Sequence, residues 1–290
     1  MLPFRNILFP VDYSEPCRAV VPYVREMVRH FSAELTLVHA YGPEALASSE
    51  LALSNPKLPE EVRILMEQRL RDFAVEAFPG KHVETLVELG EAGAAIHKLV
   101  QRQGTDLVML ATHGRGPIRR LLLGSVAAKV LHDVSAAVWT GTGSVLAGQP
   151  GIPYTSVLCA LAWGAGDEAE ETEAVLKAAA AFAAGYKARL TVAHVIEMPP
   201  PNVAVDFSPY RKELIDSASF QLRELMGKLG IDAPHAVIEG EIPEAIADEA
   251  ARTHASLIVT GRGLAQAKFS AMWSRLFPIV RLAPCPVLSI

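Results

Sequence analysis

The sequence is poor in the residues that would tie this chain to a disulfide framework or to a nucleic acid. Its three cysteines, Cys17, Cys159 and Cys285, lie far apart and form no CxxC pair, so we expect reduced, buried thiols. Basic residues (27) do not outnumber acidic ones (32), and the formal net charge is −5. This balance argues against a nucleic-acid-binding surface, although local basic clusters could still bind a small anion.

Long apolar runs are also missing. The first residues do not read as a signal peptide, because Pro3, Arg5, Pro10 and Asp12 interrupt any apolar segment. The most apolar stretch, residues 174–184, is too short to span a bilayer. We therefore expect a cytoplasmic protein that does not contact a membrane.

Several enzyme signatures are absent. The sequence has no G-x-x-x-x-G-K-[ST] phosphate loop, no HExxH metal motif and no G-x-S-x-G nucleophile elbow. His39 and His194 stand at matching places in two similar segments, and we expect both to be structural rather than metal ligands. A metal centre or a covalent hydrolase mechanism is therefore not indicated.

What the chain does contain is a repeat. Residues 6–12 open one copy and residues 156–162 open a second, and each opening is an apolar run typical of a buried parallel strand. Strands alternating with amphipathic helices follow in both copies, which predicts α/β domains with right-handed crossovers. We expect domains at 1–145 and 153–290, joined by a glycine- and proline-rich linker at about 141–153.

The predicted elements run in the same order in both copies. One helix of the first copy is expected to carry an apolar face made of Val62, Leu65, Met66, Leu70, Phe73 and Ala77. The predicted strands are 7–11, 35–40, 82–88, 106–111 and 136–140, then 155–162, 189–195, 234–239, 256–260 and 286–290.

Two polar clusters of the first copy end predicted strands. One is residues 10–14, after the first strand, and the other is residues 111–116, after the fourth. In an open parallel sheet, ligands bind beyond the carboxyl ends of the strands where the strand order reverses. If the first and fourth strands are neighbours, both clusters face one crevice, where Asp12 could accept a hydrogen bond from a ribose hydroxyl or an adenine amino group.

The second cluster leads to a predicted helix start at Gly124-Ser125. The free N–H groups of a helix N-terminus suit a phosphate, and glycine lets backbone approach it closely. Ser125 could cap the helix or bind a phosphate oxygen. Arg115, Arg119 and Arg120 would add positive charge beside this loop.

At these residues the chain resembles the universal stress protein family, whose nucleotide signature is Gly-x-x-Gly, nine residues, then Gly-Ser or Gly-Thr. The chain has Ala111-Thr112-His113-Gly114, nine residues, then Gly124-Ser125, and both its opening segment and residues 37–40 are also similar. The resemblance implies two tandem doubly wound five-stranded parallel sheets of strand order 3-2-1-4-5, similar to adenine nucleotide alpha hydrolases. It also implies that the two domains pack as a pseudo-dimer within one chain.

In ATP-binding members this pattern holds the nucleotide, so the resemblance implies ATP, with or without Mg²⁺, in the first domain. Ala111 departs from the family by replacing the first signature glycine. The implied binding residues are Pro10, Val11, Asp12, Ala40, Ala111, Thr112, His113, Gly114, Arg115, Gly116, Gly124, Ser125 and Val126.

The second copy departs further. Ala160, Ala162 and Trp273 replace Pro10, Asp12 and Gly124, while Gly263 is matched to Gly114 after a loop one residue shorter. We therefore predict that the second domain does not bind ATP and serves as a structural partner. Arg262, Lys268 and Arg275 leave a different anionic ligand open.

Three functions remain open at this point. The first is a nucleotide-binding stress-response regulator, and the second is a scaffold that binds no nucleotide and acts on an unknown protein partner. The third is a slow ATPase or phosphotransferase, for which only Asp12 and His113 offer a general base. The short apolar final strands favour pairing between the two copies and leave open whether two chains form a homodimer.

Overall fold

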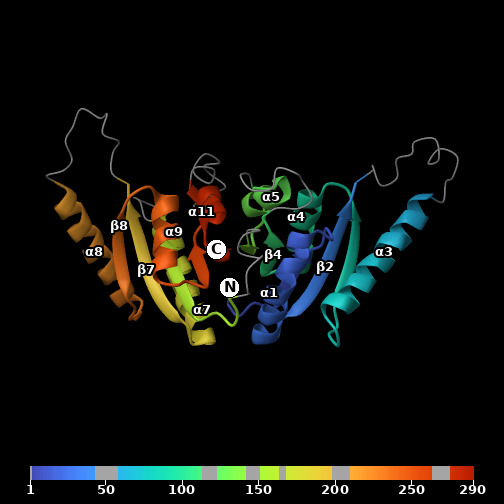
Figure 1. Cartoon of the computed structure of the whole chain (residues 1–290), viewed down its shortest axis with the longest axis horizontal. Helices are drawn as coiled ribbons and strands as arrows, with labels where there is room; N and C mark the ends of the chain where they lie inside the picture. Colours follow the sequence, from blue (N-terminus) through green and yellow to red (C-terminus); the bar gives the residue numbers. More distant parts are fainter. Residues whose placement is uncertain are drawn as a thin grey trace, which may run out of the picture. The chain divides into compact units, whose positions relative to one another are not determined.

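The structure is a computed structural model that describes residues 2–42, 58–112, 123–141, 151–162, 168–197, 210–262 and 275–290. The chain divides into two compact units, the first ending at Pro150 and the second beginning at Gly151. Each unit has its own strands and helices in alternation (Figure 1).

The elements of each unit follow the predicted order. The first unit contains β1 (Asn6–Pro10), α1 (Glu15–Phe31), β2 (Glu34–Tyr41), α3 (Leu58–Ala77), β3 (Glu84–Leu89), α4 (Ala92–Gln103), β4 (Leu107–Ala111), α5 (Ser125–Asp133) and β5 (Ala137–Gly141). The second contains β6 (Ser156–Leu161), α7 (Glu168–Tyr186), β7 (Arg189–Ile196), α8 (Arg211–Lys228), β8 (His235–Glu239), α9 (Ile242–Arg252), β9 (Leu257–Thr260), α11 (Phe277–Leu282) and β10 (Val287–Ser289).

Both units have the predicted strand order. All paired strands in the first unit are parallel and run β3-β2-β1-β4-β5, while the second unit runs β8-β7-β6-β9-β10. Ile7 of β1 lies opposite Leu35 of β2 and Leu107 of β4. The first and fourth strands are therefore neighbours, and the order of the strands reverses at β1 as the crevice prediction requires.

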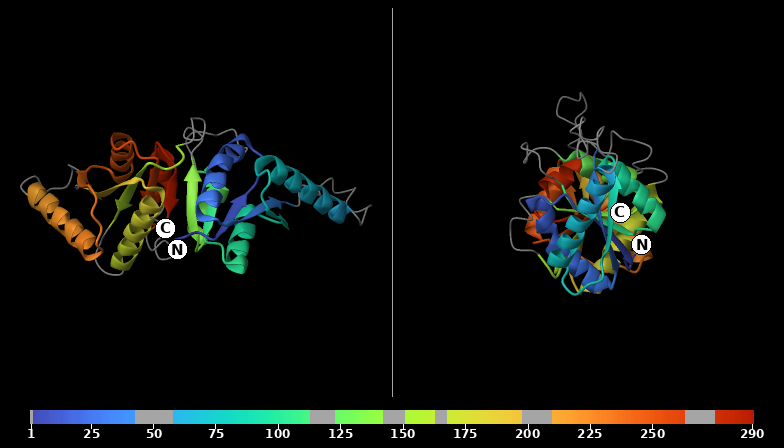
Figure 2. Two further views of the ribbon diagram at one scale, coloured as in Figure 1. Left: turned by 90° about the horizontal axis from the view of Figure 1, so that it is seen from below. Right: turned by 90° about the vertical axis from the view of Figure 1, so that its right-hand side faces the viewer.

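Helices cover both faces of the first unit's sheet. Figure 2 shows α1 and α4 on opposite sides of the strands, and α4 packs against α5. The core between these layers includes Leu8, Phe9 and Trp139, all 0% exposed. The Trp139 ring lies 4.9 Å from that of Tyr23 on α1, between ring centroids, so β5 is fixed to the helix layer by an aromatic contact.

One predicted apolar face is only partly buried. Leu65 of α3 is 61% exposed, whereas the buried residues of this helix all lie in its second half, at Leu70, Phe73, Ala74 and Ala77. The helix packs against β2 and the edge strand β3. The prediction that Leu65 lies on the buried face of this helix is wrong, because only the second half of α3 is buried against the described part of the unit.

The described parts of the chain contain free cysteines and short or polar helices. Cys17, Cys159 and Cys285 are all buried and free, as predicted. No described helix has the length and apolarity needed to cross a bilayer. Within the same residues, no three His, Cys, Asp or Glu side chains gather where they could hold a metal ion.

Candidate functional site

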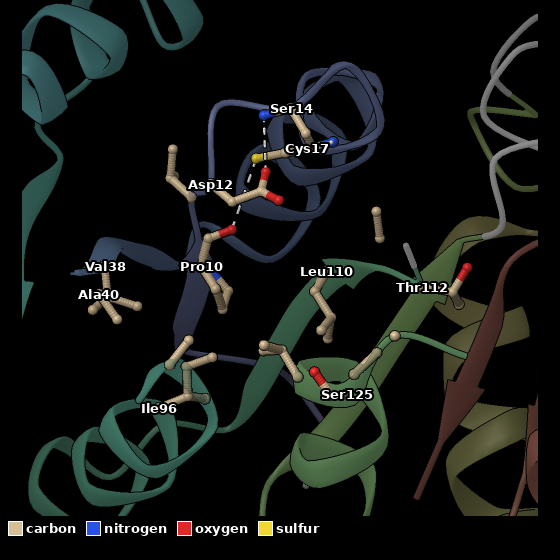
Figure 3. A pocket seen from close by; sticks show the side chains of 16 residues that line it. Pro10, Asp12, Ser14, Cys17, Val38, Ala40, Ile96, Leu110, Thr112 and Ser125 are labelled. Atoms are coloured by element: carbon tan, nitrogen blue, oxygen red, sulfur yellow. Dashed lines mark hydrogen bonds between the residues drawn. The ribbon is translucent and has the colours of Figure 1, made fainter. Parts of the chain in front are cut away.

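A cavity of about 470 Å³ lies where β1 and β4 end, within the range of roughly 300–1,000 Å³ that small-molecule sites occupy. In Figure 3, Asp12 stands at one end of the cavity and Ser125 at the other, with the apolar side chains of Pro10 and Leu110 between them. The lining residues are Pro10, Val11, Asp12, Ser14, Cys17, Val38, Ala40, Ala92, Ile96, Leu110, Ala111, Thr112, Gly124, Ser125, Val126 and Ala127.

The segment after β1 is held by its own polar side chains. The Asp12 carboxylate accepts a hydrogen bond from the Ser14 N–H at 2.9 Å, and Tyr13 between them has a positive φ of 63°. The Ser14 hydroxyl in turn accepts from the Cys17 N–H at 3.2 Å and caps α1. Asp12 is therefore both a turn residue and the one carboxylate among the described residues that line the cavity.

His39 has the structural role that the sequence predicts. Its Nδ1 lies 2.7 Å from the carbonyl oxygen of Val11, and because a carbonyl only accepts, this nitrogen carries the hydrogen. His194 makes the matching contact with the carbonyl oxygen of Leu161 at 3.1 Å, and burial lowers its pKa. Both histidines thus fix the end of the first strand of their unit to the second strand.

The N-terminus of α5 forms part of the cavity wall. The Gly124 N–H donates to the carbonyl of Thr112 at 2.8 Å, and the Thr112 N–H donates to that of Gly141 at 3.0 Å. Gly124, not Ser125, is the N-cap residue, and no side chain of the described residues caps this helix. The suggested capping role of Ser125 is therefore wrong, because the helix begins at Ser125 itself and its hydroxyl lies one position too late.

Three helix N-termini border the cavity, and they differ in how their N–H groups are satisfied. Ser14 caps α1, and the Glu91 carboxylate caps α4 by accepting from the N–H groups of Gly93 and Ala94 at 2.7 and 2.8 Å. Only α5, of these three, begins without a side-chain cap. Its first N–H groups are the ones available to an anion in the cavity.

Cys17 is a lining residue that the sequence does not single out. Its thiol lies 3.8 Å from the carbonyl oxygen of Pro10, and the side chain is 4% exposed. Burial raises the pKa of the Cys17 thiol to about 12. The thiol is therefore protonated at neutral pH and contributes a small apolar surface rather than a nucleophile.

Nine of the thirteen predicted site residues line this cavity, and the other four, His113, Gly114, Arg115 and Gly116, lie outside the described residues. The nine come from three separate segments (10–12, 111–112 and 124–126) and from Ala40 on β2, so the topology brings together what the sequence separates. The lining residues missing from the prediction are Ser14, Cys17, Val38, Ala92, Ile96, Leu110 and Ala127. The periodicity of α4 indicates that Ile96 is buried, but it does not indicate that the side chain faces a cavity.

The strand register fixes the alignment of the two copies up to Thr112 and Arg262. Leu107 and Leu257 pair with equivalent residues of β1 and β6, and the N–H groups of Thr112 and Arg262 donate to the carbonyls of Gly141 and Ile290. Gly261 therefore corresponds to Ala111, and the residue missing from the second copy falls after Arg262. The match of Gly263 to Gly114 lies outside the described residues and stays a prediction.

Comparison with known proteins agrees with the fold. The structure resembles a universal stress protein from Archaeoglobus fulgidus with a TM-score of 0.71 and 19% identity, covering 98% of this chain and 95% of that one. It also resembles protein PA1789 from Pseudomonas aeruginosa, with a TM-score of 0.67 and 16% identity over 99% and 92% of the two chains.

The sequence comparisons point to the same group. Universal stress protein MJ0577 from Methanocaldococcus jannaschii is 22% identical over 147 residues, which are 44% of this chain and 88% of that protein. The sequence profile of the universal stress protein family matches residues 3–140 and again residues 164–290. With both units matched, the chain belongs to the universal stress protein family as a tandem two-domain member.

Proposed function

We propose that the first unit binds ATP and that the protein acts as a nucleotide-dependent regulator rather than as an efficient enzyme. The observation that carries this proposal is the uncapped N-terminus of α5 at one end of the cavity. A helix N-terminus attracts anions through its free N–H groups and its partial positive charge. The phosphates would therefore lie against Gly124, Ser125 and Val126.

The opposite end of the cavity suits a nucleoside. The Asp12 carboxylate has one oxygen bound to the Ser14 N–H, which fixes its direction and leaves acceptor capacity for a ribose hydroxyl. Pro10, Val11, Val38 and Ala40 supply apolar surface at the ends of β1 and β2, against which a purine ring would lose contact with water. The cavity thus has polar groups at both ends and apolar walls between them. This distribution of polar and apolar groups suits an adenine nucleotide.

Mg²⁺, if it accompanies ATP, would be held chiefly by the nucleotide. The described lining offers a single carboxylate, Asp12, and Mg²⁺ takes six oxygen ligands at short distances. Phosphate oxygens and water would have to supply the rest. We also propose that the second unit is a structural partner, and its pairing with the first within one chain stays a prediction.

The direct test is nucleotide retained by the purified protein. Mass spectrometry of the denatured protein should detect ATP or ADP, and added ATP should raise the melting temperature. At ~100 times the dissociation constant, binding stabilises a protein by about 2.7 kcal/mol. Protein that carries no nucleotide and does not respond to ATP would support the scaffold function instead.

A substitution at the N-cap of α5 makes the test specific. Gly124→Trp imports the residue that the second copy has at this place, and the backbone there (φ −62°, ψ 145°) accepts any side chain. We expect it to abolish the ATP-dependent rise in melting temperature. Gly124→Ala is the matched control, because a methyl group leaves the N–H groups accessible and should keep most of the response.

A further inference from the structure

The residue between Asp12 and Ser14 has a backbone conformation that its type rarely adopts. Tyr13 has a φ of 63°, in the left-handed region that is unfavourable for a bulky side chain. Across this residue the Ser14 N–H donates to the Asp12 carboxylate at 2.9 Å, a bond that Figure 3 shows as a dashed line. Residues in such conformations persist only where surrounding contacts impose them, so the direction of the Asp12 carboxylate depends on what holds Tyr13.

The Tyr13 side chain contacts two elements outside its own turn. On β2, the His39 ring lies 4.8 Å from the Tyr13 ring between centroids. On α3, the Arg69 guanidinium carbon lies 4.1 Å from the centroid of the Tyr13 ring, and the Phe73 ring packs edge-on at 5.8 Å. A guanidinium is attracted by the negative face of an aromatic ring. One cation and two rings therefore fix the side chain of this strained residue.

Asp12 is held through the residues on both of its sides. His39 Nδ1 binds the carbonyl oxygen of Val11 at 2.7 Å, and the same imidazole is the β2 neighbour of the Tyr13 ring. Residue 11 is thus anchored by a hydrogen bond and residue 13 by its side chain. The Asp12 carboxylate changes direction only when one of these contacts opens.

Helix α3 reaches this segment along one line of its surface. Arg69, Phe73 and Glu76 are spaced by four and three residues, which places them above one another on a helix. Glu76 pairs with Arg18 of α1 at 2.9 Å, but both side chains are largely exposed, so this ion pair adds little stability. Phe73 is 3% exposed and belongs to the core. Arg69 is exposed, and it is the contact to Tyr13 that can be removed without opening the core.

We infer that Tyr13 and Arg69 are positioning residues for the proposed ATP site. Neither is among the residues that line the cavity, but the cation–π contact between them holds the turn that directs the Asp12 carboxylate toward the ribose. These roles rest on the proposed function, because ATP is the ligand that Asp12 would contact. They also give α3, which supplies none of the described lining residues, an effect on the nucleoside end of the cavity and none on the phosphate end at α5.

The first experiment needs no nucleotide, so it tests the positioning whether or not the protein binds ATP. Hydrogen exchange of the Ser14 amide, followed by NMR, reports how often its bond to the Asp12 carboxylate opens. Arg69→Ala should speed this exchange about two- to fivefold, the range set by one exposed cation–π contact, while the amides of β1 keep their rates. Arg71→Ala is the matched control, since this arginine of the same helix pairs with Glu67. Ser14 exchange that is unchanged in Arg69→Ala would overturn the inference.

The second experiment separates positioning from a general loss of structure. In Arg69→Ala the dissociation constant for ATP should rise about two- to fivefold, whereas that for inorganic triphosphate, which has no ribose, should keep its wild-type value. Arg69→Lys retains a cation and should recover part of the ATP affinity. In an Asp12→Ala background, Arg69→Ala should cause no further loss, because its effect passes through Asp12. Titration calorimetry measures all of these constants.

Variants of Tyr13 complete the test. Tyr13→Phe keeps the ring and should bind ATP as the wild type does, while Tyr13→Gly accepts the positive φ without the ring and should weaken ATP binding at least as much as Arg69→Ala. Equal losses for ATP and triphosphate, or additive losses with Asp12→Ala, would overturn the inference. Wild-type protein that binds no ATP would overturn the proposed function instead, and the exchange of the Ser14 amide would still decide whether Tyr13 and Arg69 hold the turn.

Discussion

The two units of this chain share a backbone frame and differ in a few side chains at the ends of their strands. In the first unit, Asp12 follows β1 and borders a cavity of about 470 Å³. In the second, Ala162 takes that position, and Glu171 lies against the end of β9. The frame itself is retained, because His39 and His194 make the same contact with the first strand of their units.

Strand order and the histidine contacts are shared, so they cannot be what distinguishes the units. The charge and size of the residues after the first and fourth strands do differ, and we expect them to decide whether a unit binds a nucleotide. The substitutions below exchange or remove these residues, from the largest expected effect to the smallest.

The largest effect should come from the core of the first unit. Trp139→Ala removes a fully buried indole that packs on Tyr23, and such truncations cost about 3–5 kcal/mol. Denaturant unfolding should show this loss, and hydrogen exchange should place it in β1, β4 and β5 rather than in β6 and β9. Phe220→Ala, which truncates a side chain that is 58% exposed, should change stability little. Equal loss of protection in both units would show that they do not have separate cores.

The next largest effect should come from substitution of Asp12, which we expect to lower the affinity for ATP. Asp12→Ala imports the second unit's residue and would remove the charged hydrogen bond that we propose between Asp12 and the ribose, worth roughly 1.5–3 kcal/mol, so the dissociation constant for ATP should rise about 10- to 100-fold. Asp12→Asn keeps an oxygen for the Ser14 N–H and should weaken binding less. Titration calorimetry distinguishes the two, and unchanged affinity in Asp12→Ala would remove Asp12 from the proposed site.

The buried thiols predict a loss of stability at high pH. Burial raises the pKa of Cys17 and of Cys285 from the ordinary value of a thiol to about 12, and it also raises the pKa of Cys159. Above pH 9 the unfolded chain loses thiol protons that the folded chain keeps, so unfolding becomes more favourable as pH rises, by about 1.4 kcal/mol per pH unit for each thiol.

Lysine and tyrosine side chains also lose protons at high pH. A comparison of cysteine variants separates the contribution of the thiols to the unfolding free energy from theirs. Cys17→Ala should show a shallower fall of unfolding free energy between pH 9 and 11 than the wild type, by the amount due to one thiol. Urea titrations at several pH values measure it. Cys159→Ala should do the same for the second unit, and a slope that neither variant changes would mean that the thiols ionise in the folded protein.

Cys17 also shows where sequence reasoning ends. The resemblance to universal stress proteins implied the strand order, and with that order the strand-end positions of Asp12 and Gly124 predicted that both residues line one cavity. The inclusion of Cys17 and Ile96 in the cavity wall could not be predicted, because a buried helical residue gives the same signal whether it faces a core or a cavity. That distinction depends on how each helix is rotated against the sheet.

In the second unit, too, the sequence does not reveal which side chains lie at the ends of the strands. The sequence indicates that Ala162 and Trp273 replace the first unit's site residues, but it gives no sign that Glu171 lies beside Gly261. The segment between β6 and α7 is longer than its counterpart between β1 and α1. Alignment from the strand therefore does not reveal which residue of α7 lies at the end of β9.

The smallest expected effect compares two helix starts at equivalent places. The Glu91 carboxylate accepts two N–H groups at the start of α4, whereas Glu241 at the start of α9 makes no side-chain capping bond. Glu91→Ala should cost about 1 kcal/mol of stability and Glu241→Ala close to none. Urea unfolding of the two variants measures the difference. Equal costs would mean that the charge of each glutamate near a helix N-terminus, and not the hydrogen bonds of Glu91, supplies the stabilisation.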